Sequence, residues 1–454
     1  MTPSALYPTT LRLVRFSLPA MLAGMMVPLM GLIDVAVLGR LGDAAVIAAV
    51  GVAGTIFTTI AWSFSFLRFT TTGLVSQAAG RGDEEGVVVE GLRPLTAALV
   101  GGAVLLLLRE PLLALGLALV GPEPDVAAHA GDYFRLRMLG APLTLSLYAL
   151  QAWLMGTGRP RTMLASQAFM TALNASLSAY LVLVRGQGVA GAALATVAAE
   201  AATVALVVAV VLRRVPLSRW RAGWPRVFDA AAWRRLLSAN TDLVVRTVVL
   251  SLSLALLNER GARLGTEVLA ANQLLLQSYL LVATLIDGVS LGVEVYAGRA
   301  VGARDPAALR HVVSRGARMA VLWGAAVAAL VAAVPGAYLP LMTTNAPLVE
   351  LARSYWGWQV ALPLVAVWAF LWDGVYFGAV RTRSLRNSMI ASTAVYAACS
   401  FALGALLGNH GLWLALAVQL VARAATLTAA WPALLRSVAE TAPVAAAPAP
   451  ASPT

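Results

Sequence analysis

The chain is poor in charge, cysteine and histidine. Only 12% of its 454 residues are charged, about half the share found in soluble domains, while 60% are hydrophobic and the mean hydropathy is +0.80. A single cysteine, Cys399, excludes an internal disulfide. The three histidines are not spaced like metal ligands, and the sequence has no glycine-rich phosphate loop. This composition excludes a soluble globular domain and gives no support to a metal site or to ATP-driven transport.

Arginine supplies all the basic side chains, because the sequence contains no lysine. A formal net charge of +12 could suggest a nucleic-acid partner, but the arginines stand at the ends of apolar runs, chiefly in alternate loops. That placement is typical of a membrane protein whose basic loops stay in the cytoplasm. We therefore expect a lipid bilayer as the environment and no nucleic-acid partner.

Long apolar runs are the main feature of the sequence. A membrane-spanning helix needs about 20 mostly apolar residues, and about twelve such runs are present. They cover residues 11–38, 44–79, 86–108, 125–155, 161–184 and 188–212, and then 234–260, 266–300, 308–334, 347–380, 384–407 and 411–436. The runs are continuous rather than alternating, which excludes a membrane β-barrel. The predicted fold class is an all-α membrane protein with about twelve transmembrane helices.

The basic loops also predict an orientation. The densest group of arginines lies in the loop between the sixth and seventh runs, at residues 213–233. Basic loops remain on the cytoplasmic side of a bacterial inner membrane, so we expect a multi-pass protein of the inner (plasma) membrane with both termini in the cytoplasm. The tail at 437–454 is rich in proline and alanine and is predicted to be disordered.

The two halves of the chain resemble each other. Gly80 corresponds to Gly302 and Asp83 to Asp305, both at a shift of 302 − 80 = 222 residues. We therefore predict an N-terminal six-helix lobe at 1–212, a cytoplasmic loop at 213–233 and a C-terminal six-helix lobe at 234–436. An even number of helices in each lobe places the pseudo-two-fold axis along the membrane normal, as in alternating-access transporters whose substrate sites lie between the halves.

Six stretches carry a resemblance to a known family. They are "LPAMLAGMMVPLMGLIDVAVLGRLG", "FLRFTTTGLVSQAAGRGD", "GVAGAALATV", "NTDLVVRTVVL", "GARLGTEVLAANQLLLQ" and "DGVSLGVEVYAGRAVGARD". In their number and order they resemble the multidrug and toxic compound extrusion (MATE) family, in its DinF-like branch. The resemblance implies two six-helix lobes around a central cleft, cation-coupled export of drug-like compounds, and no enzymatic activity or bound cofactor. We also expect a monomer.

Asp34 is the acidic residue of the first apolar run. A charge inside a spanning helix costs roughly 2.5–3.5 kcal/mol on insertion scales, and the resemblance places the coupling carboxylate of many family members at this position. We therefore predict that Asp34 binds the coupling proton. The alternative is that it pairs with Arg40 or water and has no role. Pro19 and Pro28 interrupt the backbone hydrogen bonds of the same helix and predict a bending point.

Four polar residues are candidate neighbours of Asp34. Asn174 and Ser178 are four residues apart on the fifth helix and share one of its faces. In archaeal members of the family that this chain resembles, an asparagine and an aspartate stand at this spacing. Here Ser178 stands in place of the aspartate. Thr196 matches a threonine of the family's sixth helix, and Gln151 on the fourth helix could complete a hydrogen-bonded cluster. Packing between helices is the alternative role for Gln151, Asn174 and Thr196.

The C-terminal half has more charge within its apolar runs. Asp242 and Arg246 are four residues apart and are predicted to pair. Three further acids complete the set, namely Asp287, Glu294 and Asp373. Either these groups form a fixed ion-pair network, or they form an additional proton or cation site.

The sequence thus predicts a proton-coupled antiporter that exports lipophilic, often cationic compounds. Three alternatives remain open. The first is sodium coupling through the acids of the C-terminal half. The second is a lipid-linked precursor flippase, which would need a cationic cleft to hold pyrophosphate. The third is a membrane sensor that transports nothing, which the duplicated halves disfavour.

Overall fold

The computed structural model describes residues 6–41 and 43–440, except the side chains of Val27, Pro28 and Ala44. In these residues all regular structure is helical, as predicted. Eleven helices are long and apolar enough to cross a membrane, and a twelfth span forms if a pair bent by 51° is counted as one. The number of spans predicted from the sequence is therefore confirmed.

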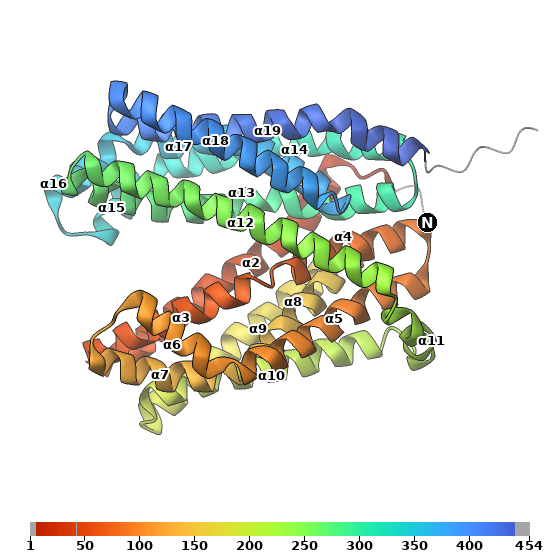
Figure 1. The fold of residues 1–454 in the computed structure, drawn as a ribbon, viewed down its shortest axis with the longest axis horizontal. Coiled ribbons are helices and arrows are strands. Elements are labelled where there is room, and N and C mark those ends of the chain that lie inside the picture. Colours follow the sequence, from red (N-terminus) through yellow and green to blue (C-terminus); the bar gives the residue numbers. More distant parts are fainter. Residues whose placement is uncertain (1–5, 42, 441–454) are drawn as a thin grey trace, which may run out of the picture.

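The helices of the first half form a bundle of their own (Figure 1). They are α2 (Thr10–Gly39), α3 (Ala44–Trp62), α4 (Phe66–Arg81), α5 (Glu84–Leu107), α6 (Arg109–Val120), α7 (Pro124–Met138), α8 (Ala141–Gly156), α9 (Pro160–Ala179) with a π-helical turn η1 (Tyr180–Val184), and α10 (Gly188–Leu212). The second half begins after the short helix α11 (Leu217–Val227). Its helices are α12 (Ala230–Arg263), α13 (Thr266–Gly302), α14 (Pro306–Ala333), α15 (Pro335–Met342), α16 (Ala346–Ser354), α17 (Trp356–Gly378), α18 (Thr382–Leu407) and α19 (Asn409–Glu440).

Four details differ from the prediction. The 213–233 segment contains α11, and residues 437–440 continue α19, so only residues 441–454 of the predicted tail lie outside the described residues. The second span is interrupted between α3 and α4, and the fourth is bent between α7 and α8, where Gly140 is followed by Pro142. Short helices α6 and α15 occupy equivalent places in the two halves.

The repeat is visible in the turns that start equivalent helices. The turn before α5 has Gly82 at φ 72° and then Asp83, whose carboxylate caps Gly86 N at 2.7 Å. The turn before α14 has Arg304 at φ 57° and then Asp305, which caps Ala308 N at 2.9 Å. A left-handed residue followed by an aspartate N-cap ends one helix and begins the next. Both turns follow the 222-residue shift.

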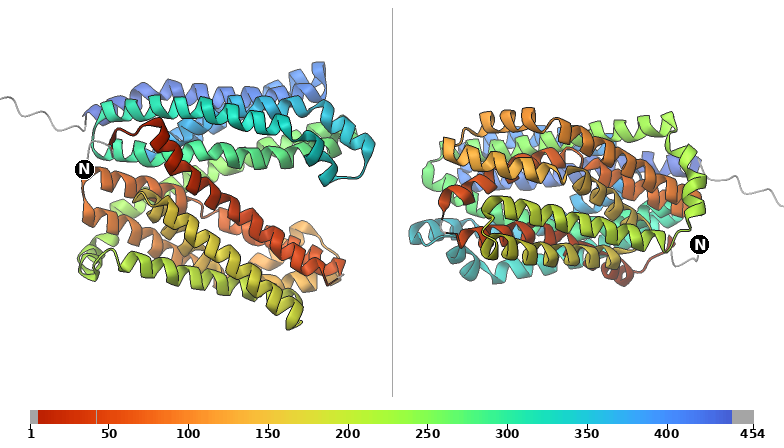
Figure 2. Two further views of the ribbon diagram at one scale, coloured as in Figure 1. Left: turned by 180° about the vertical axis from the view of Figure 1, so that it is seen from behind. Right: turned by 90° about the horizontal axis from the view of Figure 1, so that it is seen from below.

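The two bundles meet at one end of the molecule and diverge toward the other (Figure 1). We call the first the closed end; it carries the turns after α4, α8, α13 and α17. The second, the open end, carries α6, α7, α15 and α16. Figure 2 shows α2 running diagonally from the C-terminal bundle at the closed end to the N-terminal bundle at the open end. Its start bonds to the C-terminal bundle, because His311 Nε2 lies 3.0 Å from the Pro8 carbonyl and Tyr7 donates to Asp305 at 2.8 Å.

Glycines bring the lobes together at the closed end. A Cβ at Gly80 of α4 would stand 2.2 Å from the Arg299 carbonyl oxygen of α13, and a Cβ at Gly302 of α13 would stand 2.0 Å from the Gln77 carbonyl oxygen of α4. These two contacts exchange places under the 222-residue shift, since 299 − 77 = 222. The pseudo-two-fold axis therefore passes between α4 and α13. Gln77 Nε2 also donates to the Gly378 carbonyl at 2.8 Å, which ties α4 to α17.

Candidate functional site

Asp34 lies in the open-end half of α2 and is 6% exposed. The Ser178 hydroxyl on α9 donates to Asp34 Oδ1 at 2.8 Å, and the Thr196 hydroxyl on α10 lies 3.5 Å from Oδ2. Asn174 Nδ2 donates to Thr196 Oγ1 at 2.9 Å. The structure thus gathers three of the four predicted neighbours, Asn174, Ser178 and Thr196, around the Asp34 carboxyl group. Asp34 does not pair with Arg40.

This cluster has the composition of a site that exchanges a proton. The partners of Asp34 are hydroxyl groups, and among the described residues no cationic group lies within ion-pair distance of it. Burial penalises the charged form of a carboxyl that has no counter-ion. Asn174 is fully buried, and its Oδ1 atom has no hydrogen-bond partner among the described residues.

The structure does not confirm the predictions for Gln151, Pro19 and Pro28. Gln151 Nε2 donates to Gln167 Oε1 at 2.5 Å, so the structure places Gln151 in an α8–α9 contact and not in the Asp34 cluster. Gln167 stands seven residues, about two helical turns, before Asn174 on α9, so this amide pair lies nearer the closed end than the Asp34 cluster. Helix α2 continues through Pro19 and Pro28 without a break. Bending at Pro19 stays a prediction, and the Pro28 side chain lies outside the described part of the chain.

A buried ion pair stands beside the cluster and was not identified as a pair from the sequence. Arg137 of α7 donates to both carboxylate oxygens of Glu200 on α10, at 2.9 and 2.7 Å, and Thr144 donates to Glu200 at 2.9 Å. The guanidinium carbon of Arg137 lies 4.0 Å from the ring centre of Phe57. An arginine inside an apolar run is the signal that could have revealed this pair, because such a charge needs a buried partner.

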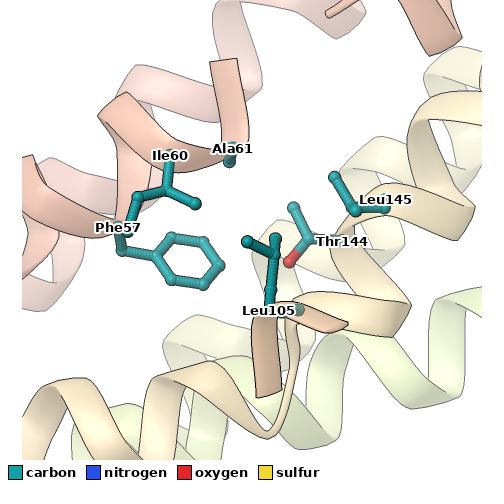
Figure 3. A pocket seen from close by; sticks show the side chains of 7 residues that line it. Phe57, Ile60, Ala61, Leu105, Thr144 and Leu145 are labelled. Carbon is teal, nitrogen blue, oxygen red and sulfur yellow. The ribbon is translucent and has the colours of Figure 1, made fainter. Parts of the chain in front are cut away.

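Figure 3 shows an apolar crevice next to this pair. It lies between α3, α5 and α8, and Phe57, Leu105 and Thr144 are among its lining residues. It has about 180 Å³ of space between atoms but no room for a water molecule. It is therefore too narrow to hold a drug-sized compound in this conformation.

In the C-terminal lobe, the predicted pairing of Asp242 with Arg246 is wrong. Arg246 Nη2 donates to Asp373 on α17 at 3.0 Å, and Arg423 on α19 also contacts that carboxylate. Asp242 instead accepts from Arg386 of α18 at 2.6 Å and from Thr382 at 2.8 Å. The four-residue spacing does put Asp242 and Arg246 on one face of α12. Each of them nevertheless pairs with a residue of a neighbouring helix, Asp242 with Arg386 of α18 and Arg246 with Asp373 of α17.

Asp287 and Glu294 remain outside these pairs. Glu294 is 2% exposed, and its Oε1 atom has no hydrogen-bond partner in the described part of the chain. Three guanidinium groups, those of Arg68, Arg246 and Arg423, lie close enough to interact electrostatically with the half-buried Asp287. Besides Arg246, the interior of this half therefore holds Arg423, which is 6% exposed.

The described residues contain no group of three or more His, Cys, Asp or Glu side chains arranged to hold a metal ion. Asp242 and Asp373 each form ion pairs with arginines. The acids of the C-terminal lobe are therefore not gathered around one point. Their arrangement matches an ion-pair network that joins α12, α17, α18 and α19.

Known proteins resemble this chain over almost its whole length. The family model MatE matches residues 19–180 and again residues 243–401, once in each half. DNA damage-inducible protein F of Escherichia coli K12 is 34% identical over 415 residues, which cover 91% of this chain and 90% of that protein. A probable multidrug resistance protein NorM of Bradyrhizobium diazoefficiens is 29% identical, with 89% of each chain covered.

Solved structures share the fold. The Vibrio cholerae MATE transporter VcmN in its bent form superposes with a TM-score of 0.86 at 19% identity, covering 97% of this chain and 100% of that one. A MATE crystal structure in the straight conformation gives a TM-score of 0.82 at 18% identity, covering 96% and 99%. With the repeated helices, the two-lobe architecture and the family model matched in both halves, the chain belongs to the MatE family of multidrug efflux transporters.

Proposed function

We propose that the protein is a proton-coupled antiporter of the plasma membrane that exports lipophilic, often cationic compounds by alternating access. The observation that carries this proposal is the Asp34 cluster. Asp34 has hydroxyl partners and, among the described residues, no cationic group within ion-pair distance, so loading and release of a proton changes its charge without breaking an ion pair. Small-molecule substrates and a membrane environment follow from the family; we expect a monomer and no nucleic-acid partner.

Coupling to protons is favoured over coupling to sodium. A sodium site needs several oxygen ligands around one point. Asp373 contacts two guanidinium groups and Asp242 contacts Arg386, so neither carboxylate is available to a cation without losing its partner.

A lipid-linked precursor flippase is a weaker alternative. Such a protein would present net positive charge to a pyrophosphate group. Arg68, Arg246 and Arg423 give this idea some support, but Asp373 already pairs with Arg246 and Arg423, and Asp287 lies close to all three. The interior therefore suits neutral and cationic compounds better than a dianion.

We propose that the arginine-rich loops hold the closed end on the cytoplasmic side and that the conformation described here is therefore outward-facing. Asp34 then lies in the half of the N-lobe nearer the outside, where it can take up a proton from the external solution. Relatives have been solved in forms named straight and bent. We propose that protonation of Asp34 favours bending of α2 at Pro19, where one helical hydrogen bond is already absent.

The energetics are sufficient for a neutral substrate. One charge crossing 100 mV is worth about 2.3 kcal/mol, which supports roughly a fifty-fold concentration ratio. One proton exchanged for a monovalent cation moves no net charge, so for such a compound only the pH gradient drives export. The dependence on membrane potential therefore reports the stoichiometry.

Asp34→Asn tests the proposal, because it keeps the size and hydrogen bonding of the side chain and removes its titration. In proteoliposomes with an imposed pH gradient, the wild type should transport ethidium and Asp34→Asn should not, although both are folded and inserted. Glu267→Gln, an exposed carboxylate on α13, is the matched control and should behave like the wild type. Gradient-driven transport by Asp34→Asn at the wild-type rate, or wild-type transport driven by sodium alone, would refute proton coupling at this site.

A further inference from the structure

A concave site lies at the closed end, near the start of α2, whereas the Asp34 cluster lies near the other end of that helix. It has a cavity volume of about 360 Å³ and is formed where α2, α9 and α13 come together with the end of α10. Five of its ten lining residues are arginines, and none of the ten is acidic. These arginines are Arg12, Arg15, Arg159, Arg161 and Arg214. We call this site the arginine pocket.

A sixth arginine enters from the other lobe. Arg299 of α13 reaches the loop before α9, where a Cβ at Gly158 would stand 2.5 Å from its Nη2 atom. Gly158 has φ 85°, so this backbone also favours glycine. Tyr296 of α13 lines the pocket and packs edge-on against Phe16 of α2, with ring centres 5.7 Å apart. The arginine pocket therefore contains side chains from both lobes.

Donor groups in the pocket lack partners. Arg159 Nη1 and Arg299 Nε are buried atoms without a hydrogen-bond partner among the described residues. Burial and the nearby positive charge of Arg214 both lower the pKa of Arg159. Helix α9 begins at Pro160 on the wall of the pocket, and its N-terminal amides add positive potential there. Clustered guanidinium groups without acidic neighbours are the arrangement that binds phosphate oxygens.

We propose that the arginine pocket binds a phosphate-bearing anion, and that its occupation stabilises the conformation in which the closed end is shut. An anion held by Arg159 and Arg161 on one side and Arg299 on the other links the two lobes. When the lobes part at this end, α13 leaves and the site loses one wall. The effect on conformation rests on the alternating-access transport proposed above.

Two sources share this chemistry, a phospholipid headgroup and a soluble phosphate. The spans of α2 and α9 begin at residues 10 and 160, beside the lining arginines, so the pocket lies at the depth of the headgroups. Basic pockets between transmembrane helices on the cytoplasmic side are known to take anionic headgroups. Both sources are included in the test.

Binding is measured by native mass spectrometry on the purified full-length protein, with cardiolipin, phosphatidylglycerol, phosphatidylethanolamine and inorganic phosphate as separate probes. The variant Arg161→Gln with Arg214→Gln removes two exposed arginines of the pocket. The control, Arg221→Gln with Arg235→Gln, removes two exposed arginines of the same face outside it. We expect cardiolipin or inorganic phosphate to bind the pocket variant at least about tenfold more weakly than the control. Equal affinity for every probe in the two variants would overturn the proposal.

The conformational effect has its own readout. Spin labels at Ser218 on α11 and Arg383 at the start of α18, in a Cys399→Ala background, report the separation of the lobes at the closed end. The anion that binds should increase the population of short distances in the control variant and not in the pocket variant. An equal increase in both would contradict the link to conformation. Anion binding is measured without substrate or a proton gradient. If the anion does not bind but proton-coupled transport is intact, the anion-binding proposal is rejected and the proposed transport function is not affected.

Discussion

Adding a methyl group at Gly80 should weaken the closed end of the transporter. A Cβ there would stand 2.2 Å from the Arg299 carbonyl oxygen, whereas ordinary van der Waals contact begins at 3.4 Å. Helices α4 and α13 must therefore separate by about 3.4 − 2.2 = 1.2 Å, since the oxygen belongs to the α13 backbone and the Cβ is bonded directly to the α4 backbone. Overpacking of this kind costs about 1–3 kcal/mol.

This overpacking destabilises only the conformation in which the lobes meet at the closed end, because α4 and α13 separate when the lobes part there. The ratio of shut to open molecules should then fall by a factor of roughly 5–150. Gly302→Ala should act in the same way, because its Cβ would stand 2.0 Å from the Gln77 carbonyl oxygen. The two substitutions are equivalent under the pseudo-two-fold axis.

Distances between spin labels at Ser218 and Arg383 measure the shift. Gly80→Ala should move the distribution toward longer distances relative to the parent, and proton-driven export should slow because the outward-facing state is less populated. Gly54→Ala is the control, since a Cβ at Gly54 meets nothing within 4 Å. Distance distributions of Gly80→Ala and Gly54→Ala that coincide would refute the claim that α4–α13 packing holds this end shut.

Two further predictions concern stability and orientation. Arg386→Ala leaves the buried Asp242 without its cation and should cost about 3 kcal/mol, at the low end for a broken buried pair because Arg386 is 32% exposed. Adding Asp242→Asn should recover much of the loss in thermal unfolding of the purified protein, and no recovery would mean that the pair is not what stabilises this region. A cysteine at Ser218 in a Cys399→Ala background should resist membrane-impermeant thiol reagents in intact cells, whereas one at Leu341, 83% exposed at the open end, should react. The reverse pattern would invert the proposed topology.

The sequence predicted the spans and the Asp34 cluster well, for identifiable reasons. Apolar runs longer than a bilayer is thick have one solution, the spanning helix. Asn174 and Ser178 share a helix face by their spacing, and the family resemblance placed that face toward Asp34 and Thr196. The repeat also predicted the direction of the pseudo-two-fold axis, and the glycine contacts between α4 and α13 show where it passes.

Partner choice among charged groups could not be predicted in the same way. Spacing along one helix shows which side chains share a face, but Arg246 pairs with Asp373, 127 residues away, and Asp242 pairs with Arg386, 144 residues away. Such choices depend on the rotation and depth of neighbouring helices, which local patterns do not specify. The arginine pocket was missed for the same reason, because its walls come from four separate helices.

Release of protons on drug binding tests the central claim most directly. Ethidium is added to purified wild-type protein in weakly buffered detergent solution, with and without sodium, and the pH of the solution is followed. The proposed mechanism predicts release of protons from the wild type that is independent of sodium and absent from Asp34→Asn. Release of equal size from Asp34→Asn, or no release from a wild type that binds the drug, would contradict the assignment of Asp34 as the coupling group.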